Sequence, residues 1–213
     1  LRGHGVLEPA ILAEELGPFH ATFHIPAFLE GGRTTENGIH YLNGIPVHTT
    51  DFGRDNIFGF STSDLAKWIE EKSFGKIQAK NILHVEIKQL DMAFNSGDGF
   101  QSLLNFLFKL ENNISVVVDA KLPHHLETFA RAIKLVSKEK RFLFRTAASF
   151  INYLSELQPN PKDTSDLVSL KSKDSEFKYK PGLIMVGSHV KLATDQLEVL
   201  LKDNSCEGLE IPV

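Results

Sequence analysis

Hydrophobic and polar positions alternate along much of the chain in ways that predict strands. Apolar and polar side chains take turns from Phe19 to Ile25, which is the spacing of a strand. Further strands are predicted at Ile82 to Ile87, Ile114 to Val118 and Arg141 to Phe144. The unbroken β-branched character of Ile114 to Val118 is typical of a strand that is covered on both faces.

Helical spacing of apolar residues fills the intervals between these strands. The predicted helices are Val6 to Leu16, Ser63 onward, a segment following Gly99, His124 to Lys138 and Thr146 to Leu157. The order strand, helix, strand, helix, strand, helix from about residue 82 to 157 is typical of a parallel sheet with crossover helices. The pattern therefore predicts an α/β fold with a mostly parallel sheet.

One segment departs from this alternation. Asn43-Gly44 lies between two short apolar segments, and an Asn-Gly pair in that position is a strong signal for a hairpin turn. We therefore expect a β-hairpin excursion from the main sheet over roughly residues 32–50.

The composition changes beyond residue 157. Residues 158–181 are polar and rich in Lys and Ser, as in an interdomain linker. Leu183 to Val186 then predicts a strand, and Thr194 to Leu201 predicts a helix. Such a unit is too small to bury a core of its own. We therefore expect a first domain of residues 1–157 and the start of a truncated second α/β domain at residues 182–213.

Composition and charge limit the class of protein. The chain has 213 residues, of which 42% are hydrophobic and 23% charged, as in ordinary globular proteins. A net charge of −4 argues against a nucleic-acid partner, and no apolar segment is long enough to cross a membrane. Cys206 is the single cysteine, which excludes an internal disulfide and favours a cytoplasmic location. Because Leu1 is not an initiator methionine, we expect a chain that is cut or processed at its start.

Several well-known catalytic motifs are missing. The sequence contains neither the GxxxxGK[ST] phosphate loop nor the GxGxxG dinucleotide fingerprint. Its histidines form no HExxH or Cys/His motif, and the adjacent His124 and His125 are expected on different faces of a helix. No metal site is therefore expected.

Candidate binding residues follow predicted strands. At Phe142 to Phe150 a short strand enters a helix, with Arg145 and two hydroxyl side chains at the turn. Ligands of open α/β sheets gather at the carboxyl ends of strands, where a helix N-terminus attracts an anion. The guanidinium group of Arg145 suits a carboxylate or a phosphate. The alternative is that Arg145 pairs with a structural acid while Thr146 or Ser149 caps the helix.

Other polar residues occupy similar positions at strand ends and in loops. They are Arg2, His4, Arg33, Thr34, Thr50, Asp55, Asp119 and Ser149. Three arginines suit a small anionic ligand, and hydroxyl and carboxylate groups suit a polyol. An aspartate at the end of a strand is also a common position for a general base. The alternative is that these residues cap helices, form turns and make weak surface ion pairs.

An ordered series of segments resembles the four-carbon acid sugar kinases. The segments are Leu1-Arg2-Gly3-His4, Pro26-Ala27-Phe28 with Gly32-Arg33-Thr34, Pro46 to Thr50 with Asp55, the strand ending at Asp119, Arg145 to Phe150, and Val186 to His189. These kinases are two-domain enzymes that use ATP to phosphorylate threonate, erythronate or related 2-oxo acids at the terminal hydroxyl. The resemblance spans nearly the whole chain.

The resemblance implies a division of roles between two domains. The N-terminal domain binds the sugar acid, and its carboxylate is implied to be held by Arg2, Arg33 and Arg145. The residues implied for the hydroxyl groups, or for support of the pocket, are Thr50, Asp55, Asp119 and Ser149. The second domain binds ATP, and Gly187-Ser188 resembles the first nucleotide-contacting turn of the family. Mg²⁺ is implied on the phosphates.

The chain also departs from the family pattern. The Asp-Asp motif that precedes Leu-Arg-Gly in the family is missing, and the glycine-rich nucleotide loops would lie beyond Val213. We therefore expect this chain to lack kinase activity on its own, with its catalytic residue unknown. The alternatives are a stand-alone sugar-acid or anion-binding module, half of a split enzyme completed by a partner chain, or a fold kept only as scaffold. The sequence also leaves open whether the chain forms a homo-oligomer.

Overall fold

The computed structural model describes residues 3–156, 166, 182–188 and 191–211. The chain divides into two compact units, Leu1–Gln158 and Pro159–Val213. All strands of the described residues belong to the first unit. The second unit contains helix α8 (Lys191–Leu200). None of the helices in the described residues combines the length and apolar character that a membrane span requires.

A parallel four-stranded sheet forms the centre of the first unit. Its strand order is β5-β6-β1-β7, and every neighbouring pair is parallel. The strands are β1 (Ala21–Ile25), β5 (Leu83–Val85), β6 (Ile114–Val118) and β7 (Phe142–Thr146). Strand β1 has a neighbour on each side, and all five of its residues are buried. The predicted α/β fold is confirmed.

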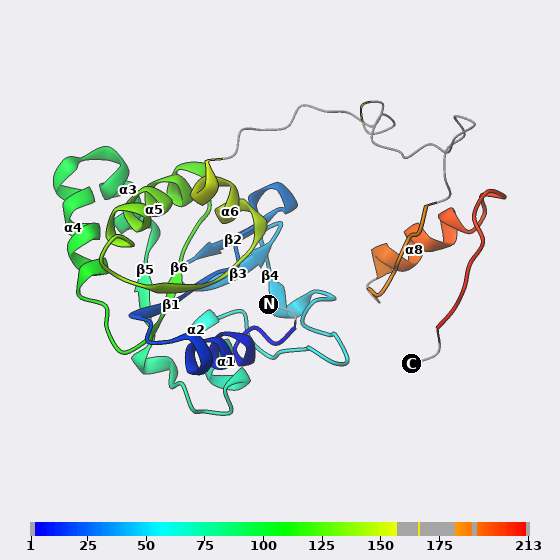
Figure 1. Ribbon diagram of the computed structural model, residues 1–213, viewed down its shortest axis with the longest axis horizontal. Coiled ribbons are helices and arrows are strands. Elements are labelled where there is room, and N and C mark those ends of the chain that lie inside the picture. Colours follow the sequence, from blue (N-terminus) through cyan, green and yellow to red (C-terminus); the bar gives the residue numbers. More distant parts are fainter. Residues whose placement is uncertain (1–2, 157–165, 167–181, 189–190, 212–213) are drawn as a thin grey trace. The chain divides into compact units, whose positions relative to one another are not determined.

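Helices cover both faces of this sheet, as Figure 1 shows. One face is covered by α3 (Ile87–Asn95), α4 (Gly97–Phe108), α5 (Pro123–Val136) and α6 (Ala148–Ser155). The opposite face carries α1 (Leu7–Leu16) and α2 (Leu65–Lys72). Short 3-10 helices occur at η1 (Leu29–Gly31), η2 (Val47–Thr49) and η3 (Ala79–Asn81). The alternating side chains of β1 therefore point toward two different layers of helices.

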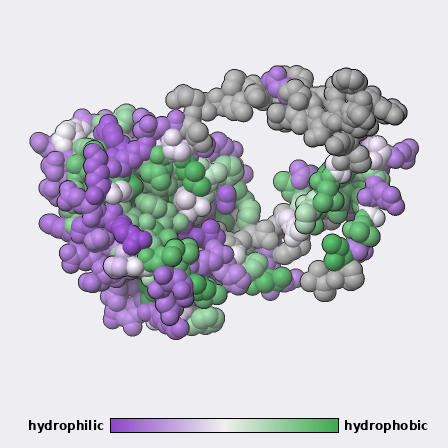
Figure 2. All heavy atoms as spheres, in the orientation of Figure 1, coloured by the Kyte–Doolittle hydropathy of each residue, from purple (hydrophilic) through white to green (hydrophobic). Residues whose placement is uncertain are grey.

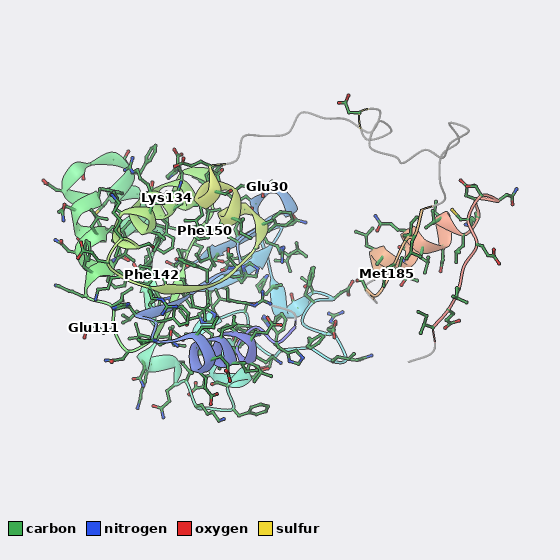
Figure 3. The ribbon with its side chains drawn as sticks, viewed as in Figure 1. Glu30, Glu111, Lys134, Phe142, Phe150 and Met185 are labelled. Carbon is green, nitrogen blue, oxygen red and sulfur yellow. The ribbon has the colours of Figure 1, made fainter. Side chains whose placement is uncertain are left out.

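Aromatic rings dominate the cluster under α3 to α6. The ring centroid of Phe23 lies 5.2 Å from that of Phe129 and 5.1 Å from that of Phe142, both edge-on, and stacks on Phe144 at 5.6 Å. Figure 3 labels Phe142 together with Phe150, which also packs into this cluster. On the opposite face a smaller cluster joins Val117 of β6 to Leu65 and Trp68 of α2. This second face also carries the polar side chains of the candidate site.

A small antiparallel sheet interrupts the α/β order. Its strands are β2 (Arg33–Glu36), β3 (Ile39–Leu42) and β4 (Ile45–Pro46). Two Asn-Gly pairs connect them, and all four residues have positive φ angles. The angles are 52° and 72° at Asn37 and Gly38, and 51° and 79° at Asn43 and Gly44. Positive φ at both central residues is the geometry of the tight hairpin turn that Asn-Gly favours. The predicted hairpin excursion is confirmed.

Helix α1 leaves much of its apolar side exposed. Only Pro9 is buried, whereas its large aliphatic residues are between 41% and 55% exposed, namely Leu7, Ile11, Leu12 and Leu16. Figure 2 shows hydrophobic residues gathered over this part of the first unit, with hydrophilic residues around much of the rim. Apolar spacing therefore predicts this helix correctly but does not show which of its side chains are covered.

Three local predictions differ from the structure. Helix α3 is not predicted, because it begins one residue after Glu86 and the strand pattern of Ile82 to Ile87 runs into it. Helix α4 begins at Gly97, since Ser96 Oγ accepts the N–H of Gly99 at 3.0 Å and caps it. Leu183 to Val186 forms no strand, because residues 182–188 and 191–211 provide no neighbouring strand for pairing.

Two further predictions concern the linker and the second unit. The predicted linker, residues 158–181, lies outside the described residues apart from residue 166. The helix predicted from Thr194 to Leu201 is present as α8, which begins three residues earlier, at Lys191.

Candidate functional site

A cavity of about 330 Å³ opens at the carboxyl ends of β1 and β7, on the α2 side of the sheet. We call it the arginine cavity. It is lined by His24, Pro26, Arg33, Phe52, Leu65, Trp68, Arg145, Thr146 and Ala147. Carboxyl ends of parallel strands are where open α/β sheets bind ligands. Two arginines predicted from the sequence, Arg33 and Arg145, line this same cavity.

The strand register brings His24 and Arg145 together. His24 of β1 lies directly opposite Arg145 of β7, and on its other side opposite Val117 of β6. Side chains directly opposite in neighbouring parallel strands point to the same face of the sheet. Val117 packs with the α2 cluster, so His24 and Arg145 face α2 as well.

Arg33 reaches the cavity from the small sheet. Its backbone N–H donates to the carbonyl of Phe28 at 2.9 Å, and its own carbonyl accepts the N–H of Phe28 at 2.9 Å. The guanidinium lies 5.0 Å from the centre of the Phe28 ring, and burial lowers its pKa. No carboxylate of the described residues forms an ion pair with Arg33. An arginine remains charged in proteins, so a half-buried positive charge faces the cavity.

Arg145 already has a weak acidic neighbour. Its Nε lies 4.0 Å from Glu8 Oε2, and the Glu8 side chain is more than half exposed. A long ion pair with an exposed partner contributes little stability. The contact with Glu8 is therefore a weak one.

His24 and Trp68 bring unusual polar atoms to the cavity wall. His24 is 4% exposed, and neither ring nitrogen has a hydrogen-bond partner among the described residues. Burial, followed by the positive charge of Arg145, lowers the His24 pKa to about 4. The imidazole is therefore neutral near pH 7. The indole Nε1 of Trp68 likewise has no partner among these residues.

The N-terminal segment packs tightly against this wall. A Cβ atom on Gly5 would lie 2.6 Å from Trp68 Cη2 and 3.4 Å from Arg145 Nε. We expect Gly5→Ala to lower the unfolding free energy by about 1–3 kcal/mol, because overpacking forces Trp68 out of position. Urea unfolding measures this effect. Gly97→Ala is the matched control, since no atom lies within 4 Å of its added Cβ; equal effects of the two changes would contradict the close packing at Gly5.

Stability should also depend on the buried histidines. Burial, with a smaller contribution from Arg33, lowers the pKa of His40 to about 3, and the His24 pKa is about 4. Because the unfolded histidines have a pKa of about 6.5, the unfolded chain binds more protons as the pH falls below that value. We expect the unfolding free energy to drop by about 2 kcal/mol for each histidine between pH 7.5 and pH 5.

Urea unfolding at several pH values tests this expectation. Replacement by a neutral side chain, His24→Gln or His40→Gln, should remove roughly half of the pH dependence, as each histidine contributes one proton. An unfolding free energy that stays constant from pH 7.5 to pH 5 would show that these rings are not held neutral.

Thr50 and Asp55 shape the loop that supplies Phe52. Thr50 Oγ1 donates to the carbonyl of Val47 at 2.7 Å and accepts the N–H of Phe52 at 3.3 Å. Asp55 Oδ1 accepts the N–H groups of Ile57 and Phe58, both at 2.9 Å. Neither side chain lines the cavity, but together they position one of its walls.

Asp119 holds the turn of the β2–β3 hairpin. Its two carboxylate oxygens accept the N–H groups of Asn37 at 2.8 Å and Gly38 at 3.0 Å. Burial raises the Asp119 pKa, although these hydrogen bonds act in the opposite direction. The carboxylate thereby fixes the hairpin that begins at Arg33, and it does not line the cavity.

Ser149 links helix α6 to the loop after β1. Its Oγ accepts the N–H of Leu29 at 3.0 Å and donates to the carboxylate of Glu30, which Figure 3 labels. Ser149 is fully buried. The two predicted nucleotide residues, Gly187 and Ser188, lie in the second unit, where Gly187 is exposed. Arg2 lies outside the described residues.

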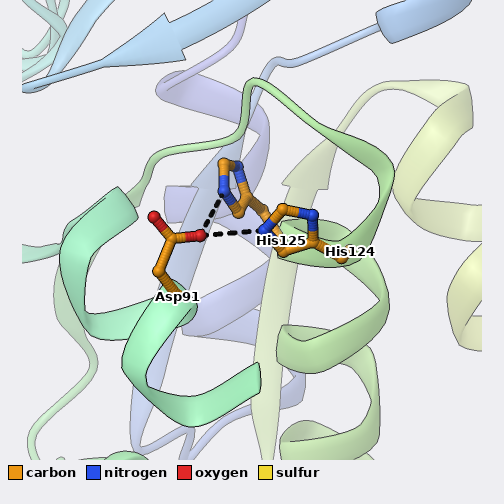
Figure 4. A group of neighbouring side chains, drawn as sticks. All are labelled: Asp91, His124 and His125. Atoms are coloured by element: carbon orange, nitrogen blue, oxygen red, sulfur yellow. Dashed lines mark hydrogen bonds and ion pairs between the residues drawn. The ribbon is translucent and has the colours of Figure 1, made fainter. Parts of the chain in front are cut away.

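Three side chains elsewhere form the group drawn in Figure 4. His124 Nε2 and His125 Nε2 lie 2.8 Å and 3.0 Å from the same oxygen of Asp91. The expectation that these histidines lie on different faces is therefore wrong, because the first turn of α5 places both rings beside α3. Possible metal-ligand atoms of the three residues lie within 4.8 Å of one another.

The hydrogen bonds of this group fit a brace better than a metal site. His125 Nδ1 accepts the N–H groups of Lys121 and Leu122 at 3.1 Å and 3.2 Å. The proton of a neutral ring is then on Nε2 and is donated to Asp91. A histidine that bound a metal through Nε2 would need an unprotonated Nε2 with its lone pair free, and its Nδ1–H would donate a hydrogen bond. The group therefore joins α3 to α5.

A second cavity, of about 490 Å³, lies beside Asp91. It is lined by Glu36, Asn37, Glu86, Ile87, Lys88, Asp91, Met92, Asn95 and Ser96. Its charged groups are three carboxylates and one lysine, which repel a small anion more than they attract it. Of the two cavities, the arginine cavity has the charge that suits an acid.

Sequence reasoning does not select His24 or Trp68. His24 occupies a polar position in an alternating strand, which predicts a solvent-facing side chain. Strand β1 lies between β6 and β7, however, and helices cover both faces of the sheet, so this position is buried. The sequence feature that could have indicated His24 is its position near the carboxyl end of a central strand.

Residues 1–154 match the family described as the Sugar-binding N-terminal domain. This match confirms the family resemblance that the ordered segments indicate. A search of curated proteins found no match to the chain.

Solved structures resemble this chain at low sequence identity. A candidate tRNA synthase from Salmonella typhimurium LT2 matches with a TM-score of 0.50 and 19% identity, over 70% of this chain and 32% of that one. A Haemophilus influenzae protein of the family DUF1537 matches with a TM-score of 0.48 and 20% identity, over 70% and 32% of the two chains. A DUF1537 domain from Bordetella bronchiseptica, a domain-swapped dimer with bound citrate, matches at 0.45 and 19%, over 63% and 28%. The chain spans about a third of the length of these structures.

Proposed function

We propose that this chain, which belongs to the sugar-binding N-terminal domain family, binds the carboxylate of a sugar acid between Arg33 and Arg145. The observation that carries the proposal is that two arginines from different sheets line one cavity. Each guanidinium offers a planar set of donors that matches a carboxylate. Arg2, which precedes the described residues, is proposed as a third contact.

The remaining candidates are proposed as supports of this pocket. Thr50 and Asp55 form turns in the loop that carries Phe52, and Asp119 holds the hairpin that carries Arg33. Ser149 connects α6 with η1. Each of these hydrogen bonds fixes a backbone segment that contributes to the cavity or adjoins it. Substitutions at Asp119 would therefore act through the position of Arg33, and those at Thr50 or Asp55 through the loop that carries Phe52.

For the whole protein we propose phosphoryl transfer from ATP to the terminal hydroxyl of a four-carbon sugar acid such as threonate, erythronate or 2-oxo-tetronate. The described chain supplies the acceptor site, and Gly187 and Ser188 are proposed to begin the nucleotide site. Mg²⁺ on the phosphates would neutralise their charge during transfer. We place this reaction in the cytoplasm, and the catalytic base is not assigned.

Calorimetric titration of the 213-residue chain tests the binding step. Threonate, erythronate and 2-oxo-tetronate are the ligands, and citrate, which is bound in the Bordetella structure, serves as a further acyclic acid. We expect saturable binding of at least one four-carbon acid, with weaker binding of its uncharged lactone because the arginines then lose their ionic partner. Equal affinity for acid and lactone would contradict a site built on carboxylate recognition.

A further inference from the structure

We propose that His24 and Trp68 recognise hydroxyl groups of the ligand, so that the arginine cavity selects polyhydroxy acids over simple carboxylic acids. This inference rests on the proposed function and deepens it, since it concerns the part of the ligand that the arginines do not hold. Its basis is the set of polar atoms that the described protein leaves without partners.

Most of these atoms belong to side chains that line the arginine cavity. Among the described residues, the buried side-chain nitrogens without a hydrogen-bond partner are both ring nitrogens of His24, Nε2 of His40 and Nε1 of Trp68. Three of these four atoms belong to His24 and Trp68, which line the arginine cavity, whereas His40 lies in strand β3 of the small sheet and does not line it. Folded proteins rarely leave buried polar groups without partners. Their concentration here indicates that a bound molecule supplies the missing hydrogen bonds.

The chemistry of the two side chains specifies the kind of group they would bind. A neutral imidazole offers one donor and one acceptor, and an indole offers one donor. A carboxylate only accepts, so it would leave the acceptor nitrogen of His24 without a partner. A hydroxyl group both donates and accepts, so two hydroxyls can pair with the two ring nitrogens of His24, one donating and one accepting, while another oxygen accepts from Trp68. Vicinal hydroxyls beside a carboxylate combine all of these features.

Ligand binding should be visible at Trp68 itself. Because His24 is only 4% exposed, a ligand reaches its ring only when neighbouring side chains of the cavity wall shift. Trp68 belongs to that wall and is the only tryptophan in the chain. Its fluorescence therefore reports occupation of the cavity without a label.

The experiment compares two acids that share a carboxylate but differ in hydroxyl groups. Threonate and butanoate are titrated against the chain by Trp68 fluorescence and by calorimetry. We expect threonate to bind on the order of 10- to 100-fold more tightly, because a hydrogen-bonding site rejects a ligand that lacks the partner group. In the His24→Leu variant the ratio of threonate affinity to butanoate affinity should fall to roughly threefold or less, mainly because threonate binds more weakly.

A second variant guards against a folding defect. Trp68→Phe keeps an aromatic wall and removes the N–H donor, and calorimetry should show a smaller loss of selectivity that again affects threonate only. If His24→Leu weakens both acids by the same factor, or if the unmodified chain binds both equally, the inference is overturned. If the unmodified chain binds no four-carbon acid at all, the proposed function fails first.

Discussion

Replacing Arg33 and Arg145 together by alanine should abolish measurable binding of a four-carbon sugar acid. A hydrogen bond to a charged group contributes roughly 1.5–3 kcal/mol, so each single substitution should weaken binding by about 10- to 150-fold. Both arginines line the same cavity and would contact the same carboxylate, so their effects need not be additive. A combined loss on the order of several hundredfold is expected, and calorimetry or Trp68 fluorescence measures it.

Arg131→Ala is the matched control for this prediction. Arg131 is an exposed arginine of α5 whose guanidinium stacks 4.2 Å from the centre of the Phe100 ring, and it does not line the arginine cavity. Its removal takes away the same charge at another place, so the affinity should change by less than about twofold. A control that weakens binding as much as Arg145→Ala would mean that net charge, and not the cavity, attracts the acid.

Phe23→Ala should strongly destabilise the first unit. Phe23 is fully buried in the central strand β1, and three other phenylalanine rings surround it. Truncation of a buried phenylalanine removes its transfer free energy and leaves a cavity, which together cost about 3–5 kcal/mol. Urea unfolding followed by circular dichroism measures this change.

Phe74→Ala provides the comparison for the core substitution. Phe74 is 93% exposed, so the same change of side chain should alter the unfolding free energy by less than about 0.5 kcal/mol. If both substitutions cost the same, the aromatic cluster under α3 to α6 would not be the main hydrophobic core.

The parallel sheet can be predicted because its strands are short, apolar and bounded by turn residues. The sequence predicts Ile114 to Val118 with the boundaries that β6 has in the structure. The hairpin can be predicted from Asn43-Gly44, whose positive φ angles few other residues adopt. Helix α3 escapes prediction since its first residues continue the apolar strand pattern, and only the capping contact between Glu86 and Gln89 marks its start.

The candidate site is predictable to a lesser degree. Arg33 and Arg145 can be selected because they lie at predicted strand ends or in loops, but their meeting in one cavity depends on how the small sheet docks on the main one. That docking uses backbone hydrogen bonds between Thr35 and Ala120, which no local pattern reveals. His24 escapes selection because burial of a central strand on both faces depends on the whole fold.

A structure of the chain with bound threonate would show whether the arginine cavity is the sugar-acid site. We expect the ligand in the arginine cavity, with its carboxylate within hydrogen-bond distance of Arg33 and Arg145 and a hydroxyl group beside His24. Threonate bound instead in the cavity beside Asp91, or elsewhere with both arginines uninvolved, would contradict the assignment of this cavity as the sugar-acid site.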